Sequence, residues 1–383
     1  MNEQIDIENL IYEPPDNQRY WVVRAENGSY IQHFKKFGLV SIGHLDEALN
    51  TKLTSEQFFK SWQSLVTGFA EKCAREKKSV YQSRAQWSQV EDFAISMSVG
   101  DLVLVPSRGS LTVGRIISEV FTDDTPLTII VDEGQPYQSV HKMSFRLHRS
   151  VQWGPTVPRS LANQALKRAL GSHRTVFCAD NYWREIHHVL YPFFKRDDQV
   201  FFSLRINRLS SISNHAIAKL FAVLSEIEAV SRTPEEALPT APDKLDELVE
   251  KMESEQELNL RVQAHFMSPG EIWGAAASLT EPVLYYLVYS AVFGSSKLGW
   301  KGFFDPRQVP KKLGTAAQKA ATLILERVKK TKTDQALENL QIEENKVDTK
   351  KLSDNSNDVT DVIAKPKKAS PPRARKKVEI VKP

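Results

Sequence analysis

The sequence predicts an α+β protein in which a small β-barrel with flanking helices precedes a second α+β domain and a charged tail. Two short apolar, β-branched runs lie between Val99 and Arg115, separated by Pro106 and Gly109, as is typical of two strands with a tight connection. Strand-like and helix-like apolar spacing then alternates before and after residue 180. The expected parts are a flexible lead-in over 1–18, a barrel domain over 19–180, a second domain over 181–330 and a disordered charged tail over 331–383.

The central hairpin is defined by the residues around its two strands. Gly100 and Asp101 are expected to form a turn before the first strand, since glycine tolerates positive φ and aspartate can bond its own backbone. Asp101 is therefore interpreted as a turn residue and not as a catalyst. Gly114 places no side chain within the second strand, which indicates a β-bulge or a close backbone approach.

The other elements of the barrel domain follow from local patterns. Thr54 precedes a helix with large apolar residues at helical spacing, so we expect it to be the N-cap. A further helix is expected over Trp87–Met97, and another from Ser160 until Gly171. Residues 29–37 fit a short helix or a loop. The remaining strands are expected at Tyr20–Ala25, Leu39–Gly43, Thr128–Val131, Phe145–Trp153 (ended by Pro155 and Pro158) and Thr175–Phe177.

The second half of the chain predicts a small α+β sandwich. Apolar alternation predicts strands at Val200–Leu209 and Leu258–Met267, the second turning into a helix that starts at Glu271. The other expected helices are Asn214–Val230, Lys244–Glu257, Pro282–Gly294 and Thr315–Lys330. Beyond residue 330, polar residues dominate without periodicity, and burial could not offset the entropy of ordering them.

Composition limits the function classes. The 383 residues allow two domains and extra segments, and the net charge of +4 is compatible with nucleic acid without selecting it. Cys73 and Cys178 have no disulfide or metal-ligand pattern, which fits a reducing cytoplasm. The acidic start of the chain lacks the apolar region of a secretory signal. The apolar run over 282–294 is shorter than the roughly 20 residues of a spanning helix, so a buried core helix is expected.

Several motifs in the first half occur in the order found in a known domain family. They are Tyr20–Ala25, Ser41-Ile42-Gly43, Gly100–Val103, Val113–Ile116, His148–Trp153, Pro158-Arg159-Ser160 and Thr175-Val176-Phe177. Residues 20–180 therefore resemble the PUA/EVE-like modification-sensing domain at the N-terminus of Mrr-type restriction endonucleases. Such domains often carry an aromatic residue after Ile-Gly, where this chain has His44. If that position lines the pocket, this difference would change the ligand preference.

The resemblance implies a pocket that accepts a base flipped out of duplex DNA, often a modified one. Such a base is held by stacking on aromatic faces and by hydrogen bonds to its edge, while arginines outside hold phosphates. Each candidate also has a plainer alternative: the tryptophans can be core residues, His44 an exposed turn residue and the arginines solvated surface charges. The candidates for pocket walls are Trp21, His44, Trp87 and Trp153, and those for backbone contacts are Arg24, Arg108, Arg115 and Arg149.

Catalysis has no support in the sequence. There is no phosphate-binding loop, no nucleophile elbow and no nuclease-like acid pattern, and no cofactor is expected. His187-His188 is interpreted as a structural pair, because no further ligands lie at metal spacing. The expected partners are DNA, possibly modified, and a protein bound through residues 181–330, as in bacterial restriction or anti-phage defence. An effector (an enzyme or membrane-disturbing protein) and a protein–protein adaptor remain alternatives. The basic end from Lys365 to Lys377 fits either phosphate contacts or a solubilising tail.

Overall fold

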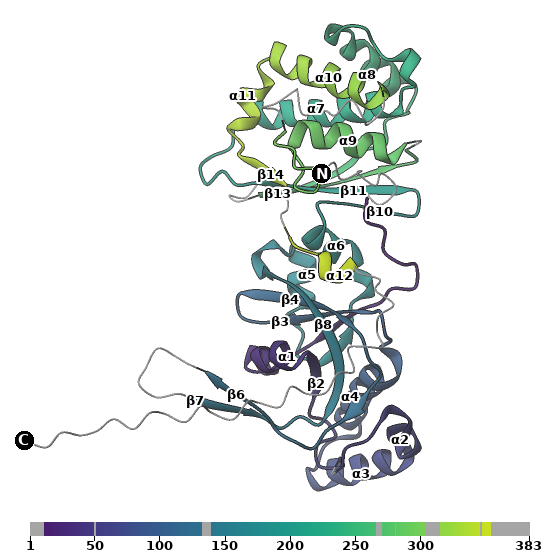
Figure 1. Cartoon of the computed structure of the whole chain (residues 1–383), viewed down its shortest axis with the longest axis vertical. Helices are drawn as coiled ribbons and strands as arrows, with labels where there is room; N and C mark the ends of the chain where they lie inside the picture. The colour runs from purple at the N-terminus through teal and green to yellow at the C-terminus, as the bar shows by residue number, and fades with distance from the viewer. Residues whose placement is uncertain are drawn as a thin grey trace, which may run out of the picture. The chain divides into compact units, whose positions relative to one another are not determined.

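Mixed helices and sheets make up the part of the chain that the structure, a computed structural model, describes (Figure 1). The described residues are 11–49, 51–131, 139–265, 270–279, 281–302, 315–344 and 347–353. The described residues up to Leu352 belong to one compact unit. The expected α+β class is confirmed, with a curled half-barrel sheet in the first half. The division of this unit at residue 180 stays a prediction.

The first sheet has seven strands in the order β2-β8-β4-β3-β1-β9, with β5 pairing with β8. The predicted central hairpin is confirmed, with Val103 opposite Gly114. β1 and β3 run parallel, and the other pairs run antiparallel. The bounds are β1 Tyr20–Val23, β2 Leu39–Ile42, β3 Leu102–Pro106, β4 Ser110–Ile116, β5 Phe121–Thr122, β8 Leu147–Pro158 and β9 Val176–Cys178.

Gly114 fulfils both roles that the sequence offered for it. The register between β4 and β8 shifts between Thr112 and Gly114, which is the predicted irregularity. A Cβ atom on Gly114 would lie 2.9 Å from Cε3 of Trp153, so the indole ring fits there only because residue 114 has no side chain. The sequence suggested that Pro155 would end this strand, but β8 continues to Pro158, and the register shift explains why. Pro155 lies in the irregular stretch of the ladder, where its missing N–H costs no strand hydrogen bond.

The first half of the chain also contains helices, which precede and follow the central hairpin in sequence. The predicted cap of α2 is confirmed: Thr54 Oγ1 accepts from Gln57 N, and Gln57 Oε1 accepts from Thr54 N at 2.9 Å. Residues 29–37 contain a helix, and the helix expected at Trp87–Met97 comprises the end of α4 and a π-helical turn, η2. The bounds are α1 Ile31–Phe37, α2 Ser55–Lys60, α3 Trp62–Arg75, α4 Val80–Glu91, η2 Asp92–Ser96, α5 Gln164–Ala169 and α6 Trp183–Leu190.

Two expectations for the first half are wrong. The strand over Thr128–Val131 is not part of the barrel: β6 (Leu127–Val131) pairs with β7 (Ser139–Met143) as a separate two-stranded ribbon. The helix expected at Ser160 begins later, because Asn163 Oδ1 accepts a hydrogen bond from Leu166 N at 2.8 Å and caps α5. Local patterns located these segments but not their partners.

The second sheet has five strands in the order β10-β11-β13-β12, with β14 pairing with β11. The helix expected from Glu271 is wrong, because residues 270–277 form a strand paired with β11 along its whole length. Small residues at Gly274 and Ala276 leave room for the core, and the ring of Phe202 lies against Gly274. The bounds are β10 Phe193–Arg196, β11 Gln199–Ile206, β12 Arg261–His265, β13 Gly270–Ala277 and β14 Ile342–Glu344.

Regular structure continues beyond Lys330, so the expected tail begins too early. α11 (Thr333–Glu338), β14 and α12 (Lys350–Ser353) follow within the described residues. Leu337, Leu340 and Leu352 are buried and supply the apolar anchors that the polar composition conceals. Residues 354–383, with the basic end, lie outside the described residues.

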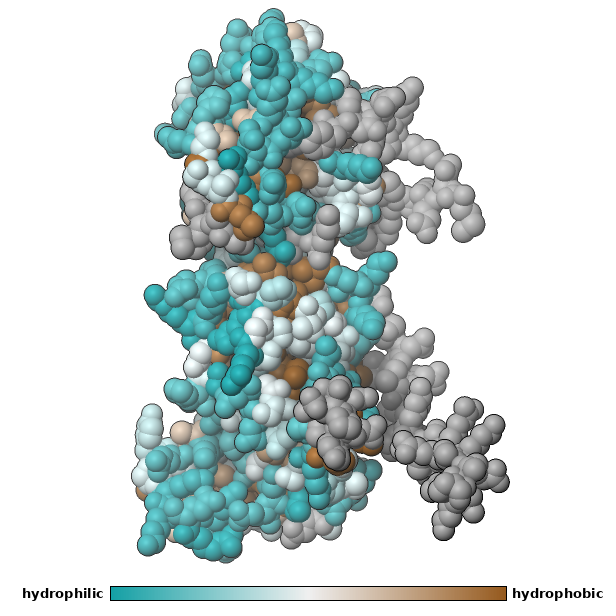
Figure 2. Space-filling model, turned by 90° about the vertical axis from the view of Figure 1, so that its left-hand side faces the viewer, coloured by the Kyte–Doolittle hydropathy of each residue, from teal (hydrophilic) through white to brown (hydrophobic). Residues whose placement is uncertain are grey.

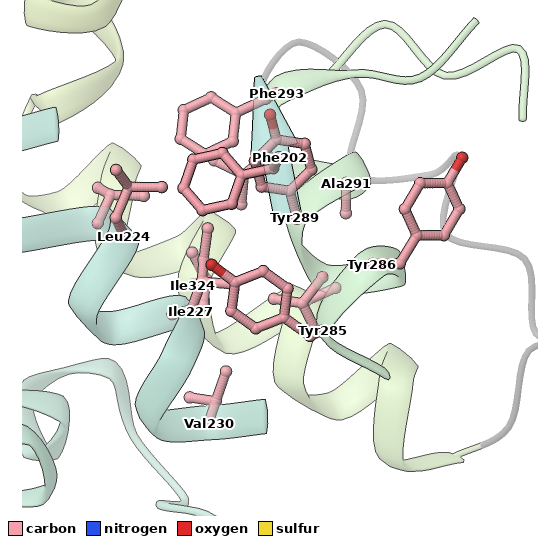
Figure 3. Close-up of a cluster of buried hydrophobic side chains, with 14 of the residues drawn as sticks. Phe202, Leu224, Ile227, Val230, Tyr285, Tyr286, Tyr289, Ala291, Phe293 and Ile324 are labelled. Atoms are coloured by element: carbon pink, nitrogen blue, oxygen red, sulfur yellow. The ribbon is translucent and has the colours of Figure 1, made fainter. Parts of the chain in front are cut away.

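A helical layer covers one face of the second sheet and forms the larger core with it (Figures 1 and 3). The predicted core helix is confirmed as α9, with Tyr285 and Tyr289 buried beside Phe202 and Phe293. No described helix has the length and apolar character needed to cross a membrane. The helices of this layer are α7 Asn214–Arg232, α8 Leu245–Ser254, α9 Pro282–Phe293 and α10 Thr315–Lys330.

The α9 tyrosines give a matched test of this core. The Tyr289 hydroxyl is buried without a hydrogen-bond partner among the described residues, whereas the Tyr286 hydroxyl and Ser295 Oγ are hydrogen-bonded at 3.0 Å. An unpaired buried polar group costs about 1–3 kcal/mol. We expect Tyr289→Phe to raise the free energy of unfolding by about 1 kcal/mol and Tyr286→Phe to lower it by about 1 kcal/mol. Urea denaturation measures both, and a loss of stability in Tyr289→Phe would contradict the assignment.

Candidate nucleic-acid interface

Trp21 and Trp153 belong to one row across the first sheet. Trp21 is the neighbour of Val103, Val103 of Gly114, and Gly114 of Trp153, so these positions share one face of the sheet. Trp21 is fully buried, and the Trp153 indole N–H donates to the carbonyl of Phe34 at 2.8 Å. Both rings pack in the core of the half-barrel, the plainer of the two roles expected for them.

The N–H of the Trp21 indole donates to Asp101 Oδ2 at 2.8 Å. The same carboxylate accepts from the backbone N–H of Ser98 at 2.8 Å, in the turn before β3. Asp101 is only 4% exposed, so these bonds compensate for the desolvation of its charge. The interpretation of Asp101 as a turn residue is confirmed, and the structure adds the contact with Trp21.

Arg149 lies inside the half-barrel. Its side chain is 0% exposed and donates to the carbonyls of Phe93 at 2.7 Å, Ala94 at 3.0 Å and Ser118 at 3.0 Å. Burial lowers the pKa of Arg149, while Glu119 and Asp101 act in the opposite direction. Carbonyls at the end of a helical turn lack partners within it, and the guanidinium supplies them for η2. This burial keeps Arg149 away from a nucleic-acid backbone.

The other three candidate arginines lie in different surroundings. Arg24 Nη2 donates to the carbonyl of Leu170 at 3.0 Å. Arg115 donates to the carbonyl of Leu352. Arg108 is exposed in the turn between β3 and β4. Arg108 is therefore the most exposed of the four candidates, as a side chain that contacts DNA phosphates needs to be.

His44 lines a cavity of about 130 Å³ beyond the end of β2. Gly43, which precedes it, packs against the ring of Phe145, where a Cβ atom would come within 2.6 Å. Two cations line the same cavity: Lys72 Nζ and Arg75 Nη2 lie 3.4 and 3.1 Å from the carboxylate oxygens of Glu47. The complete lining is His44, Leu45, Glu47, Ala48, Gly68, Phe69, Glu71, Lys72 and Arg75.

The imidazole of His44 is neutral near pH 7. Burial lowers its pKa to about 4, and the nearby charges of Lys72 and Lys78 act in the same direction, whereas a hydrogen bond with the Gln89 side chain acts in the opposite one. Its Nε2 atom is buried without a hydrogen-bond partner among the described residues. A neutral imidazole offers one donor and one acceptor, and His44 brings these groups to the lining of the cavity.

Trp87 is connected to the His44 cavity through Phe69. The ring centroids of Trp87 and Phe69 are 5.2 Å apart, and Phe69 lines the cavity. The Trp87 indole N–H donates to Glu91 Oε1 at 2.9 Å. Trp87 itself does not line the cavity: like Trp153, it packs against the core of the half-barrel that contains Trp21 and Phe69.

Sequence reasoning missed most of the cavity wall. Gly68, Phe69, Lys72 and Arg75 all come from α3, where spacings of three and four residues place side chains on one helix face. That spacing was available in the sequence, but its relation to His44 depends on how α3 packs. Among the described residues, no group of three His, Cys, Asp or Glu side chains could hold a metal ion.

Two of the candidate arginines test the contrast between interior and surface. Arg149→Met would leave three carbonyls without their donor, and we expect a loss of at least about 3 kcal/mol in the free energy of unfolding. Arg108→Met changes an exposed turn residue and should stay within about 0.5 kcal/mol of the parent protein. Chemical denaturation compares them. Equal stability of the two variants would overturn the interior role of Arg149.

Comparison with protein-family models, curated proteins and solved structures gave no match to this chain.

Proposed function

We propose that this protein is a DNA-binding sensor that holds a flipped pyrimidine, plain or modified, in the His44 cavity. The observation that carries the proposal is a neutral, half-buried imidazole that lines a cavity next to two cations. The resemblance of residues 20–180 to modification-sensing domains supports the same ligand class. No catalytic group is assigned to this cavity.

The size of the cavity selects the kind of base. An engineered protein cavity of about 150 Å³ accommodates benzene, a single six-membered ring. The cavity beside His44 measures about 130 Å³, which matches one pyrimidine ring better than the fused rings of a purine. Phe69 supplies an aromatic wall, and stacking on such a wall helps to offset the few kcal/mol that unstacking a base costs.

The polar groups of the cavity suit the edge of cytosine. Glu47 is a carboxylate acceptor, and carboxylates accept from the exocyclic amine of cytosine. Lys72 and Arg75 already contact Glu47, so a DNA phosphate at the cavity mouth would compete with that carboxylate for them. Recognition by this cavity therefore combines base-edge bonds with salt-dependent phosphate contacts.

The resemblance also extends the proposal to the biological role. We infer that the second half of the chain passes the binding signal to a protein partner in bacterial restriction or anti-phage defence, in the cytoplasm. The effector and adaptor functions remain its alternatives, and the binding experiment below separates the adaptor from the sensor.

A binding experiment tests the sensor directly. The full chain is titrated with matched duplexes that carry plain, methylated, hydroxymethylated or glucosylated cytosine, at two salt concentrations. We expect preference for one modified duplex and a loss of about tenfold in affinity for it with His44→Ala, because one base-edge bond contributes roughly 1–3 kcal/mol.

Arg84→Gln is the matched control, since Arg84 is exposed on α4 and does not line the cavity. It should retain the preference. Equal, purely salt-driven binding to all duplexes would contradict base recognition, and an absence of binding would favour the adaptor function.

The titration of His44 predicts a pH dependence of stability. The folded-state pKa of about 4 lies below the ordinary value of 6.5, so the folded chain binds this proton less readily than the unfolded chain. The stabilising contribution is complete above pH 6.5 and is lost as the pH falls towards 4. Between pH 7 and pH 5, His44→Gln should lose less stability than the parent protein, by about 2 kcal/mol. Identical losses in urea titrations would show that His44 titrates normally.

A further inference from the structure

The second sheet carries a groove on the face opposite to its helical layer. Along β11, Phe202 and Leu204 pack into the core with that layer, so Ser203 and Arg205 alternate to the other face. A cavity of about 670 Å³ lies on this side, between the sheet and α5. Figure 2 shows a hydrophobic patch at mid-height of the molecule with hydrophilic residues above and below it. The His44 cavity shares no lining residue with this groove.

The groove is longer than this single cavity. A second cavity of about 360 Å³ shares Gln263 and Trp273 with the first, so the two are adjacent across β13 and β12. Sites for single small molecules typically measure about 300–1,000 Å³. Two adjacent cavities along one face of the sheet therefore favour an elongated ligand.

Both ends of the groove have an excess of positive charge. The larger cavity is lined by Lys167, Arg168 and Arg205 against one acid, Glu271. The smaller cavity is lined by Arg184 and Arg261, again against one acid, Glu185. His188 lines it too, but burial lowers the pKa of this imidazole to about 3, so it is neutral. Positively lined clefts concentrate anionic ligands.

Trp273 lies midway between these charged ends. In the sheet, Arg205 of β11 lies opposite Glu271, and Arg261 of β12 lies opposite Ala275. Glu271 and Ala275 are two residues before and two residues after Trp273. At a rise of about 3.3 Å per residue, the backbone positions of Arg205 and Arg261 are about 13 Å apart along the strands. The indole is only 9% exposed, and the His188 ring stacks on it at 4.5 Å between centroids and 7° between planes, so Trp273 forms part of the floor of the groove.

We propose that this groove binds a single-stranded nucleic-acid segment, with a base at the level of Trp273 and phosphates towards the cations at both ends. A strand has a phosphate on each side of every base, whereas a mononucleotide has phosphate at only one end, so two flanking rows of cations favour the strand. A positively charged groove that follows the backbone is the usual arrangement for such ligands. The proposal does not depend on the function of the His44 cavity.

Fluorescence anisotropy of a labelled twelve-nucleotide oligothymidylate, titrated with the full chain between 50 and 200 mM salt, tests the proposal. Arg168 and Arg261 are exposed at opposite ends of the groove, so the double change Arg168→Gln with Arg261→Gln leaves the core intact. We expect this variant to bind at least tenfold more weakly. The slope of log affinity against log salt should fall by about 0.7 for each lost phosphate contact.

A control variant makes the outcome specific. Arg84→Gln removes an exposed arginine elsewhere and should bind like the parent protein. Loss of affinity in Arg84→Gln equal to that of the double variant would reduce the binding to general electrostatics and overturn the proposal. Unchanged affinity in the double variant, or no binding by the parent protein at 50 mM salt, would also overturn it.

Discussion

Two buried charges, Asp101 and Arg149, hold η2 to the curled sheet, and the candidate base cavity depends on that attachment. Asp101 links the backbone just after η2 to Trp21 on β1, while Arg149 on β8 donates to carbonyls within η2. Removing an ion from water costs several kcal/mol unless hydrogen bonds replace its hydration. Here each ion has at least two such bonds, so the burial fixes one position for the turn.

The position of η2 determines the position of α4, because the two helical segments are continuous in sequence. α4 carries Trp87, which packs against Phe69 and Trp62 of α3, and Phe69 forms a wall of the His44 cavity. The interior of the half-barrel is thus connected to the cavity through the backbone of η2 and α4 and the packed rings of Trp87 and Phe69. The arginine assigned to phosphate from its sequence context instead supports the cavity from a distance.

Local chemistry made much of the fold predictable. The central hairpin, the capping threonine and the core helix over 282–293 each depend on residues within one short segment, and each was expected correctly. Pairing depends on distant residues and was less accessible. β13 contains small residues that suit either a helix or a strand, and its pairing with β11 and β12 decides the outcome. The leucines after residue 330 are too sparse to predict order without the core that buries them.

The candidate site was predictable only in part, for the same reason. His44 was identified from its place after Ile-Gly, but α3, which completes the cavity, contacts it through tertiary packing. Trp21 and Trp153 show the opposite error, since a large aromatic residue in a strand has the same pattern whether it faces a ligand or a core.

The most direct test of the flipped-base cavity is a measurement of base unstacking in the bound DNA. A duplex with the fluorescent cytosine analogue pyrrolocytosine at the preferred position reports unstacking as a rise in emission, and anisotropy of the same sample reports binding. If the base enters the His44 cavity, emission rises in proportion to the bound fraction, and His44→Ala reduces the rise at saturation. Saturated binding without any change in emission would show that the DNA is held with its bases stacked, and would contradict the flipped-base cavity.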